Sequence, residues 1–159
     1  MGRSPVQYGE RGDLYAVQAV DLEVDPETGV VTLLKCVAAH GVGKAINPQA
    51  VEGQIEGGLA MGIGYALHES IEFDNGKVVN PSFVDYRLPT VMDVPEIECI
   101  LVEEPLPTGP FGAKGIGEVC SAPTAPAIAN AIFNAVGVRI KELPMSPEKI
   151  LKALEQKNK

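Results

Sequence analysis

The sequence is poor in the residues from which many catalytic and metal sites are built. It contains no tryptophan, two histidines and three cysteines in 159 residues. Cys36, Cys99 and Cys120 are odd in number and far apart, which is typical of free thiols in a reducing compartment rather than of a disulfide framework. We therefore expect them to act as small buried apolar side chains, and we expect a cytoplasmic protein.

Several familiar catalytic patterns are also absent. Gly43 and Lys44 are followed by alanine, so no phosphate-binding Walker motif is present, and neither GxGxxG nor GxSxG occurs. His40 and His68 do not stand at zinc-ligand spacing from cysteines or carboxylates, and two histidines give little support for a Ser-His or Cys-His nucleophile pair. We expect His68 to be a surface or half-buried residue on a helix.

The charge and hydropathy patterns exclude further classes. The formal net charge is -8, which argues against a surface for nucleic acid or for an anionic membrane. No apolar run reaches the ~18 residues of a membrane span, and the N-terminus has no apolar signal core. The length fits one domain, which we expect to extend over residues 1–159.

The order of the expected elements indicates an α+β fold. A turn at Asp25–Gly29, marked by proline and glycine, separates two segments rich in strand formers and predicts a hairpin. Asn47 before Pro48 is typical of a capped helix start. Strands followed by helices in mixed order give a layered fold in one domain. The expected strands are 14–24, 30–39 and 95–104, with short extended pieces at 77–90; the expected helices are 48–70, 123–137 and one starting at 147.

The helix expected at 48–70 is unusually rich in glycine. Val51, Ile55, Leu59, Ile63 and Leu67 recur every four residues and predict a stripe facing the core. The small residues Gly53, Gly57, Ala60 and Gly64 fall on one other face, where the backbone is bare. This face suits tight packing of the helix on a sheet, which we favour from the pattern alone, or the close approach of a ligand or partner. Gln54 lies beside it and is too polar to be buried without a partner.

The stretch GPFGAKGIGEVCSAPTAP, residues 109–126, is a second unusual feature. Glu118 is its only acid and Lys114 its only cation, and glycines flank both. Glu118 stands just before the expected helix at 123–137, whose dipole favours a carboxylate, and free backbone amides of a glycine loop can face an anion. Glu118 is therefore either an acid in a tight turn or a general base beside an anionic cofactor. The remaining acids on strands and turns are expected to be solvated: Glu23, Glu27, Glu96, Glu98, Glu103 and Glu104.

Two motifs together resemble a known family. NPQAVEGQIEGGLAMGIGYALHE followed by GPFGAKGIGE is similar to the C-terminal part of the molybdenum-binding subunit of the xanthine dehydrogenase and aldehyde oxidase family, the molybdenum hydroxylases. DPETGVV, DYRLPT and LPMSPEKILKAL extend the resemblance over essentially the whole chain. It implies an oxidoreductase that hydroxylates a purine, nicotinate, another N-heterocycle or an aldehyde, with water as the oxygen source.

The resemblance also implies residue roles. Glu118 matches the family's catalytic base, and Gln54 matches a residue that hydrogen-bonds the molybdopterin cofactor. Lys114, Gly115 and Gly117 match the loop that runs beside this cofactor. In the family the pterin dithiolene holds the molybdenum, so the resemblance implies no metal ligand from the protein. One departure is Gly41, where relatives often carry an aspartate after the histidine.

The chain is too short for a whole enzyme of this family. Three cysteines cannot supply the four ligands of a [2Fe–2S] cluster, so the iron–sulfur and FAD modules are expected on partner chains, with the molybdenum cofactor shared. The starting methionine favours a separately encoded subunit over a fragment, one that binds little cofactor and has no activity alone. Two alternatives remain open: a non-catalytic assembly or cofactor-binding module of the same fold, and an interaction module whose glycine-rich helix packs on a partner.

Overall fold

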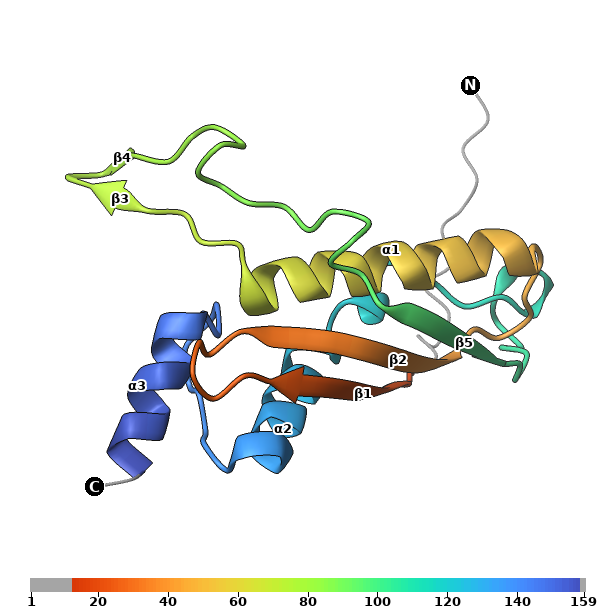
Figure 1. Ribbon diagram of the computed structural model, residues 1–159. Coiled ribbons are helices and arrows are strands. Elements are labelled where there is room, and N and C mark those ends of the chain that lie inside the picture. Colours follow the sequence, from red (N-terminus) through yellow and green to blue (C-terminus); the bar gives the residue numbers. More distant parts are fainter. Residues whose placement is uncertain (1–12, 158–159) are drawn as a thin grey trace.

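A three-stranded mixed sheet forms the centre of the computed structural model, which describes residues 13–157 (Figure 1). β1 (Ala16–Val24) and β2 (Val31–Gly41) form an antiparallel hairpin, and β5 (Glu96–Val102) lies parallel to β2 on its other side. Gly29 adopts φ 73° in the turn, in the left-handed region that favours glycine. The predicted hairpin and third strand are confirmed.

The glycine-rich helix α1 (Pro48–Leu67) starts where the sequence predicts and ends slightly earlier. The side chain of Asn47 accepts a hydrogen bond of 3.1 Å from the N–H of Ala50, and Pro48 occupies the first helical position. Ile55, Leu59 and Ile63 are fully buried, which confirms the predicted core stripe.

Close packing contacts of α1 fall on Gly58 and Gly62, which the sequence analysis did not place on the small-residue face, and on Gly64, which it did. A Cβ on Gly62 would lie 2.5 Å from Cβ of Thr124, and a Cβ on Gly58 would collide with Cys120. Around Gly53 and Gly57 no atom lies within 4 Å of an added Cβ. The packing interpretation is therefore wrong for Gly53 and Gly57, whereas Gly64 of the same predicted face packs closely against Glu69 and Pro89. At 100° per residue, positions 58 and 62 flank the buried stripe, whereas positions 53 and 57 lie opposite it.

The remaining helices pack against the same core. α2 (Thr124–Val136) buries Ile128 and Ile132 and ends at Gly137, whose φ is 70°. α3 (Pro147–Lys157) contributes Ile150. Both helices share one apolar cluster with α1 and with the inner face of the sheet. The predicted α+β architecture is confirmed.

The expectation that no apolar run is long enough to span a membrane is wrong for one segment. By length and composition, Glu118–Val136 is sufficient to cross a membrane, and it is the single such segment in the part of the chain that the structure describes. Here it comprises the short 3-10 turn η2 (Glu118–Cys120) and the separate helix α2. The segment therefore includes a helix that contributes to the core.

An arm, residues 70–94, leaves the body between α1 and β5 (Figure 1). At its tip β3 (Phe73–Asp74) and β4 (Lys77–Val78) form a small hairpin. Nearer the body, Asn80 donates to the carbonyl of Ser70 at 2.7 Å and accepts from the N–H of Glu72 at 2.9 Å. The sequence predicts short extended pieces in this region but not the hairpin or its projection from the body.

Candidate cofactor-binding and catalytic site

The glycine loop after β5 is fastened to the segment that leads into α1. The N–H of Lys44 donates to the carbonyl of Gly112 at 2.8 Å, and the N–H of Lys114 donates to the carbonyl of Val42 at 3.1 Å. Between these bonds Gly43 has φ 66°, and a Cβ there would collide with the carbonyl of Gly112. The loop, which includes the short 3-10 turn η1 (Pro110–Gly112), is thereby held near the start of α1.

Glu103 strengthens the same junction. Its carboxylate accepts 2.7 Å from the N–H of Ala45 and 3.0 Å from Nζ of Lys44. These hydrogen bonds, with Lys44 as the larger contribution, lower the pKa of Glu103. Glu103 is exposed, as predicted for the acids on strands and turns, and it also pairs with Lys44. A strand-end glutamate carries no local signal of a partner some sixty residues earlier.

A cavity of about 230 Å³ lies between this loop and the first turns of α1. Gln54 and Lys114, two residues predicted to bind a cofactor, both line it. Nζ of Lys114 donates to the carbonyl of Asp13 at 3.3 Å. The remaining lining is largely apolar and comes from residues 42–51, 113 and 116. The structure thus brings the two sequence motifs together.

Glu118 is the first residue of η2 and its side chain is exposed. Within residues 13–157 its carboxylate makes no hydrogen bond or ion pair. α2 begins at Thr124, which confirms the helix predicted at 123–137, but the short turn η2 separates Glu118 from its N-terminus. The glycines and proline of this stretch favour a turn before the helix, and η2 is too short to carry a strong dipole.

Hydrogen bonds from three side chains that the sequence analysis missed hold the turn that carries Glu118. Nε2 of Gln18 donates to the carbonyl of Cys120 at 2.7 Å, and the hydroxyl of Thr124 donates to Oε1 of Gln18 at 2.8 Å. The hydroxyl of Tyr65 donates to the carbonyl of Ser121 at 2.8 Å. A polar residue inside an apolar strand was the available signal for Gln18, but its partners are about a hundred residues away.

The backbone beside Glu118 is open. Gly115 and Gly117 are exposed, and an added Cβ at either would meet no atom within 4 Å. The N–H groups of residues 115–117 donate no hydrogen bond to any other residue in the described range. These N–H groups, the amide of Gln54 and the ammonium group of Lys114 are all hydrogen-bond donors. The space beside Gly115 and Gly117 is empty because glycine has no side chain. The residues present therefore fit a bulky anionic cofactor held by hydrogen bonds.

The cysteines are confirmed as free thiols. Burial raises the pKa of Cys36 to about 11 and also raises the pKa of Cys120, whose Sγ donates to the carbonyl of Ile116 at 3.2 Å. Cys99 is only partly buried. No group of three or more His, Cys, Asp and Glu side chains that could hold a metal ion occurs among residues 13–157.

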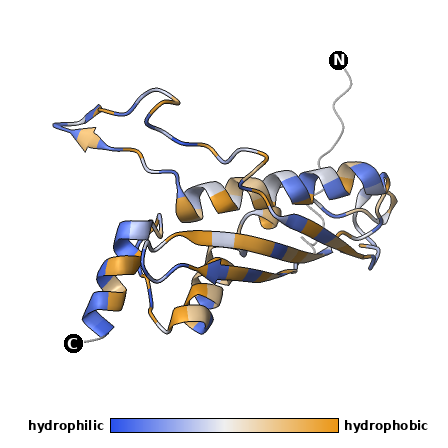
Figure 2. Ribbon diagram, in the orientation of Figure 1, coloured by the Kyte–Doolittle hydropathy of each residue, from blue (hydrophilic) through white to orange (hydrophobic). Residues whose placement is uncertain are grey.

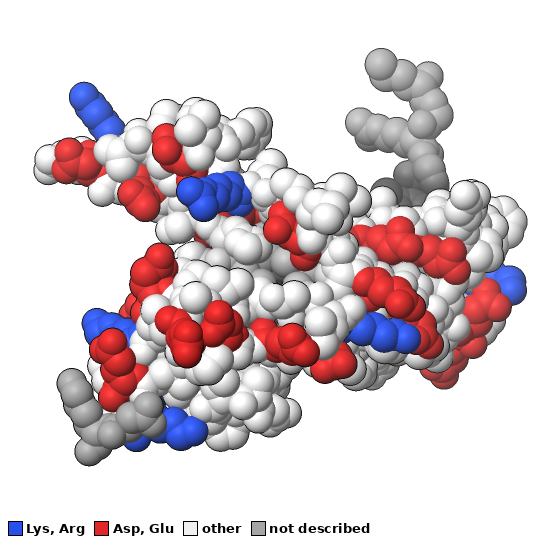
Figure 3. Space-filling view, in the orientation of Figure 1, with Lys and Arg blue, Asp and Glu red and all other residues white. Residues whose placement is uncertain are grey.

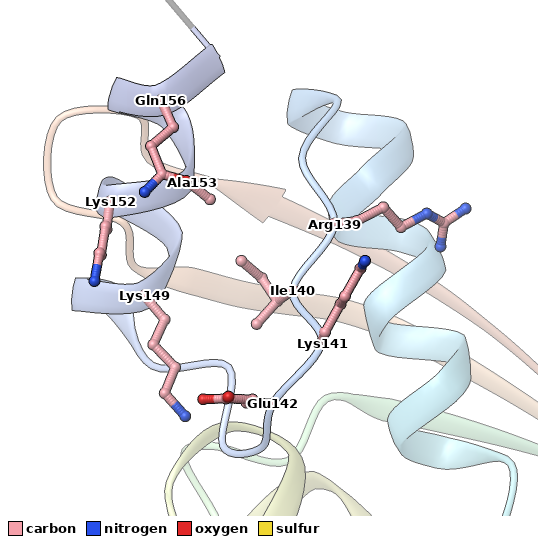
Figure 4. Close-up of a pocket in the computed structure, with 8 residues that line it drawn as sticks. All are labelled: Arg139, Ile140, Lys141, Glu142, Lys149, Lys152, Ala153 and Gln156. Atoms are coloured by element: carbon pink, nitrogen blue, oxygen red, sulfur yellow. The ribbon is translucent and has the colours of Figure 1, made fainter.

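A second cleft, of about 290 Å³, lies between α3 and the chain that precedes it (Figure 4). Lys149 and Lys152 come from α3, and Arg139 and Lys141 come from the preceding segment. Arg139 stacks over the ring of Phe133 and donates to Asn130. None of the predicted site residues lines this cleft.

Matches to known proteins extend over most of the chain. Residues 7–95 match the model of the molybdopterin cofactor-binding domain family. The chain is 37% identical to a probable xanthine dehydrogenase subunit of Bacillus subtilis, covering 90% of this chain and 19% of that protein. It is 41% identical to the putative xanthine dehydrogenase molybdenum-binding subunit of Escherichia coli K12, covering 82% of this chain and 18% of that protein.

A solved structure shows the same fold. The aldehyde oxidoreductase from Desulfovibrio gigas superposes with a TM-score of 0.82 and 39% identity, over 89% of this chain and 15% of that one. The chain spans about a fifth of the length of the curated relatives it matches.

Proposed function

The chain belongs to the molybdopterin cofactor-binding domain family, and from this premise we propose that it forms part of a molybdenum hydroxylase in which Glu118 is the catalytic base. The observation that carries the proposal is the shared cavity of Gln54 and Lys114, next to the open loop that leads to Glu118. When bound, the molybdenum cofactor supplies a two-electron redox centre for hydroxylation of substrate carbon.

The chain's own residues would hold that cofactor by hydrogen bonds. The exposed amide of Gln54 offers both donors and an acceptor. The N–H groups of residues 115–117, which have no partner among residues 13–157, offer donors to an anionic group. Lys114 adds positive charge at the cavity wall. The bare backbone of Gly53 and Gly57 on α1 leaves room for a large ring system or a partner chain.

Glu118 would accept a proton on a carboxylate oxygen. This proton would come from the water-derived oxygen that bonds to the substrate carbon. Gln18 and Tyr65 fix the backbone of its turn, whereas the carboxylate itself has no partner among the described residues that would compete for this proton. A base held by a rigid backbone with an uncommitted side chain suits general base catalysis.

The substrate and partners follow from the same proposal. We expect a purine, another N-heterocycle or an aldehyde as substrate, because the relatives are named xanthine dehydrogenase and aldehyde oxidoreductase. Partner chains would carry the [2Fe–2S] clusters, the FAD and the remaining molybdenum-binding segment. Three free thiols are consistent with a cytoplasmic location.

The test is Glu118→Gln in the complex purified from native cells. Because a positioned base contributes about 10²- to 10⁴-fold, we expect kcat to fall by that factor while the molybdenum content stays unchanged. Turnover of the chosen substrate and elemental analysis for molybdenum are the measurements. Glu23→Gln, at an exposed position of β1, is the matched control and should keep full activity.

Either of two results would contradict the proposal. Glu118→Gln with wild-type turnover would remove Glu118 from the role of base. A native complex without molybdenum would remove the hydroxylase assignment and leave a non-catalytic assembly or binding module of the same fold.

A further inference from the structure

Hydrophobic residues recur along the arm, residues 70–94, between hydrophilic ones (Figure 2), and several of the large apolar side chains are exposed. Six of them are each more than half exposed. Large exposed apolar surface, unlike single scattered side chains, marks an interaction site. The six are Ile71 (55% exposed), Phe73 (67%), Phe83 (79%), Val84 (81%), Val91 (87%) and Met92 (87%).

The arm holds its shape through polar bonds rather than an apolar core of its own. The side chain of Asn80 ties its two sides together near the body. Further along, the hydroxyl of Tyr86 donates to the carboxylate of Glu69, and Asp93 accepts from both the N–H and the hydroxyl of Thr90 at 2.7 and 2.8 Å. A surface that is ordered before binding loses less conformational entropy when it docks.

A small cavity on the arm adds a specific docking point. It measures about 220 Å³ and is lined by Ile71, Val78, Pro81 and Phe83, with Asn80 and Tyr86 at its polar side. A pocket of this size and composition accepts one large apolar side chain from a partner, which is the usual form of an interface hot spot.

We propose that the arm docks onto the part of the molybdenum-binding subunit that this chain lacks, with an apolar side chain of that part seated in the cavity. The inference rests on the proposed function. This chain spans 18–19% of the length of relatives that are xanthine dehydrogenase subunits, so about four-fifths of such a subunit lies outside it. A second copy of this chain is a poorer occupant, because it brings another formal charge of -8 against an acidic surface (Figure 3).

The experiment is a photo-cross-link in the complex purified from native cells. The residue p-benzoylphenylalanine replaces Phe83, which keeps the apolar bulk, and in a control it replaces Val17, a 69% exposed residue on the outer side of β1. We expect the Phe83 position to cross-link to a peptide of a molybdenum-binding segment outside these 159 residues, identified by mass spectrometry. We expect at least tenfold less of that product from the Val17 position.

A double variant measures the strength of the contact. Phe83→Asp with Val91→Asp should lower recovery of that same segment by tenfold or more, whereas Val17→Asp should leave recovery unchanged. Circular dichroism of each variant chain checks that it folds.

A cross-link from Phe83 to a second copy, to an iron–sulfur or flavin chain, or to no peptide would overturn the docking proposal. So would wild-type recovery with the double variant. Molybdenum content is measured on the same complex. A correctly cross-linked partner without molybdenum would contradict the hydroxylase assignment but not the docking surface.

Discussion

Single residues of the site differ in how far their surroundings can be predicted from the sequence. Gln54, Lys114 and Glu118 stand in motifs, and their chemical types could be singled out without a structure. The side chain of Gln18, which fixes the turn behind Glu118, could not be assigned because its partners Cys120 and Thr124 lie more than a hundred residues later. Positioning residues act through tertiary contacts, and those contacts leave no local pattern.

His40 is a buried histidine whose protonation differs between the folded and the unfolded chain. It lies on β2, is fully buried, and neither ring nitrogen has a hydrogen-bond partner within the described part of the chain. Burial lowers its pKa, because the charged imidazolium form is disfavoured away from water. The folded chain therefore keeps His40 neutral at a pH where the unfolded chain takes up a proton.

This difference predicts acid sensitivity of folding. Above pH 6.5, the ordinary histidine pKa, His40 contributes no pH dependence. As the pH falls below 6.5, the unfolded state is protonated first, so the free energy of unfolding should decline by at most about 1.4 kcal/mol per pH unit. Urea denaturation between pH 7.5 and about pH 5 measures this slope.

The chain contains one matched control for this prediction. His68 is exposed at the end of α1, so His68→Gln should leave the slope between pH 7.5 and 5 in place. His40→Phe should remove it, whatever its effect on stability at pH 7.5. An unchanged slope in His40→Phe would show that other groups cause the pH dependence.

At the scale of elements, α1 separates two uses of glycine. Gly58 and Gly62 allow η2 and α2 to approach the helix, whereas Gly53 and Gly57 face open space. The period of the sequence pattern predicts the core stripe correctly, because burial repeats with the helical turn. It does not show which small-residue face meets a neighbour, since that depends on where residues 120 and 124 return to the helix.

Alanine substitutions on the two faces should have opposite effects on stability. Gly57→Ala adds a methyl group in open space and removes a flexible residue, so it should raise the free energy of unfolding by about 0.5–1 kcal/mol. Gly62→Ala places a Cβ 2.5 Å from Thr124 and should lower it by about 1–3 kcal/mol. Urea denaturation of the isolated chain at pH 7.5 measures both. Equal effects of the same sign would contradict the assignment of the two faces.

At the scale of the whole molecule, the proposed cofactor site is open toward one side. Gln54, Lys114 and the backbone of residues 115–117 offer donors on one side of a shallow cavity, and the arm presents apolar surface without a partner in the described structure. The chain spans about a fifth of the relatives' length, so we infer that the other side of the cofactor site comes from residues outside it.

The isolated chain should therefore bind little molybdenum cofactor and show no turnover. Elemental analysis should give far less than one molybdenum per isolated chain, against about one per chain in the native complex. The expected cause is the missing half of the binding surface rather than misfolding, so circular dichroism of the isolated chain should show the folded α+β content. Full turnover by the isolated chain would contradict this prediction.

The sequence by itself determined the local features of this protein. Asn47 and Pro48 determine the start of α1, Gly29 allows the turn of the hairpin, and the four-residue repeat sets the buried stripe, because each depends on neighbouring residues alone. Only the tertiary structure decided that Gln54 and Lys114 share one cavity and that the arm leaves the body. These relations depend on contacts between distant segments, whose geometry is set by packing of the whole core.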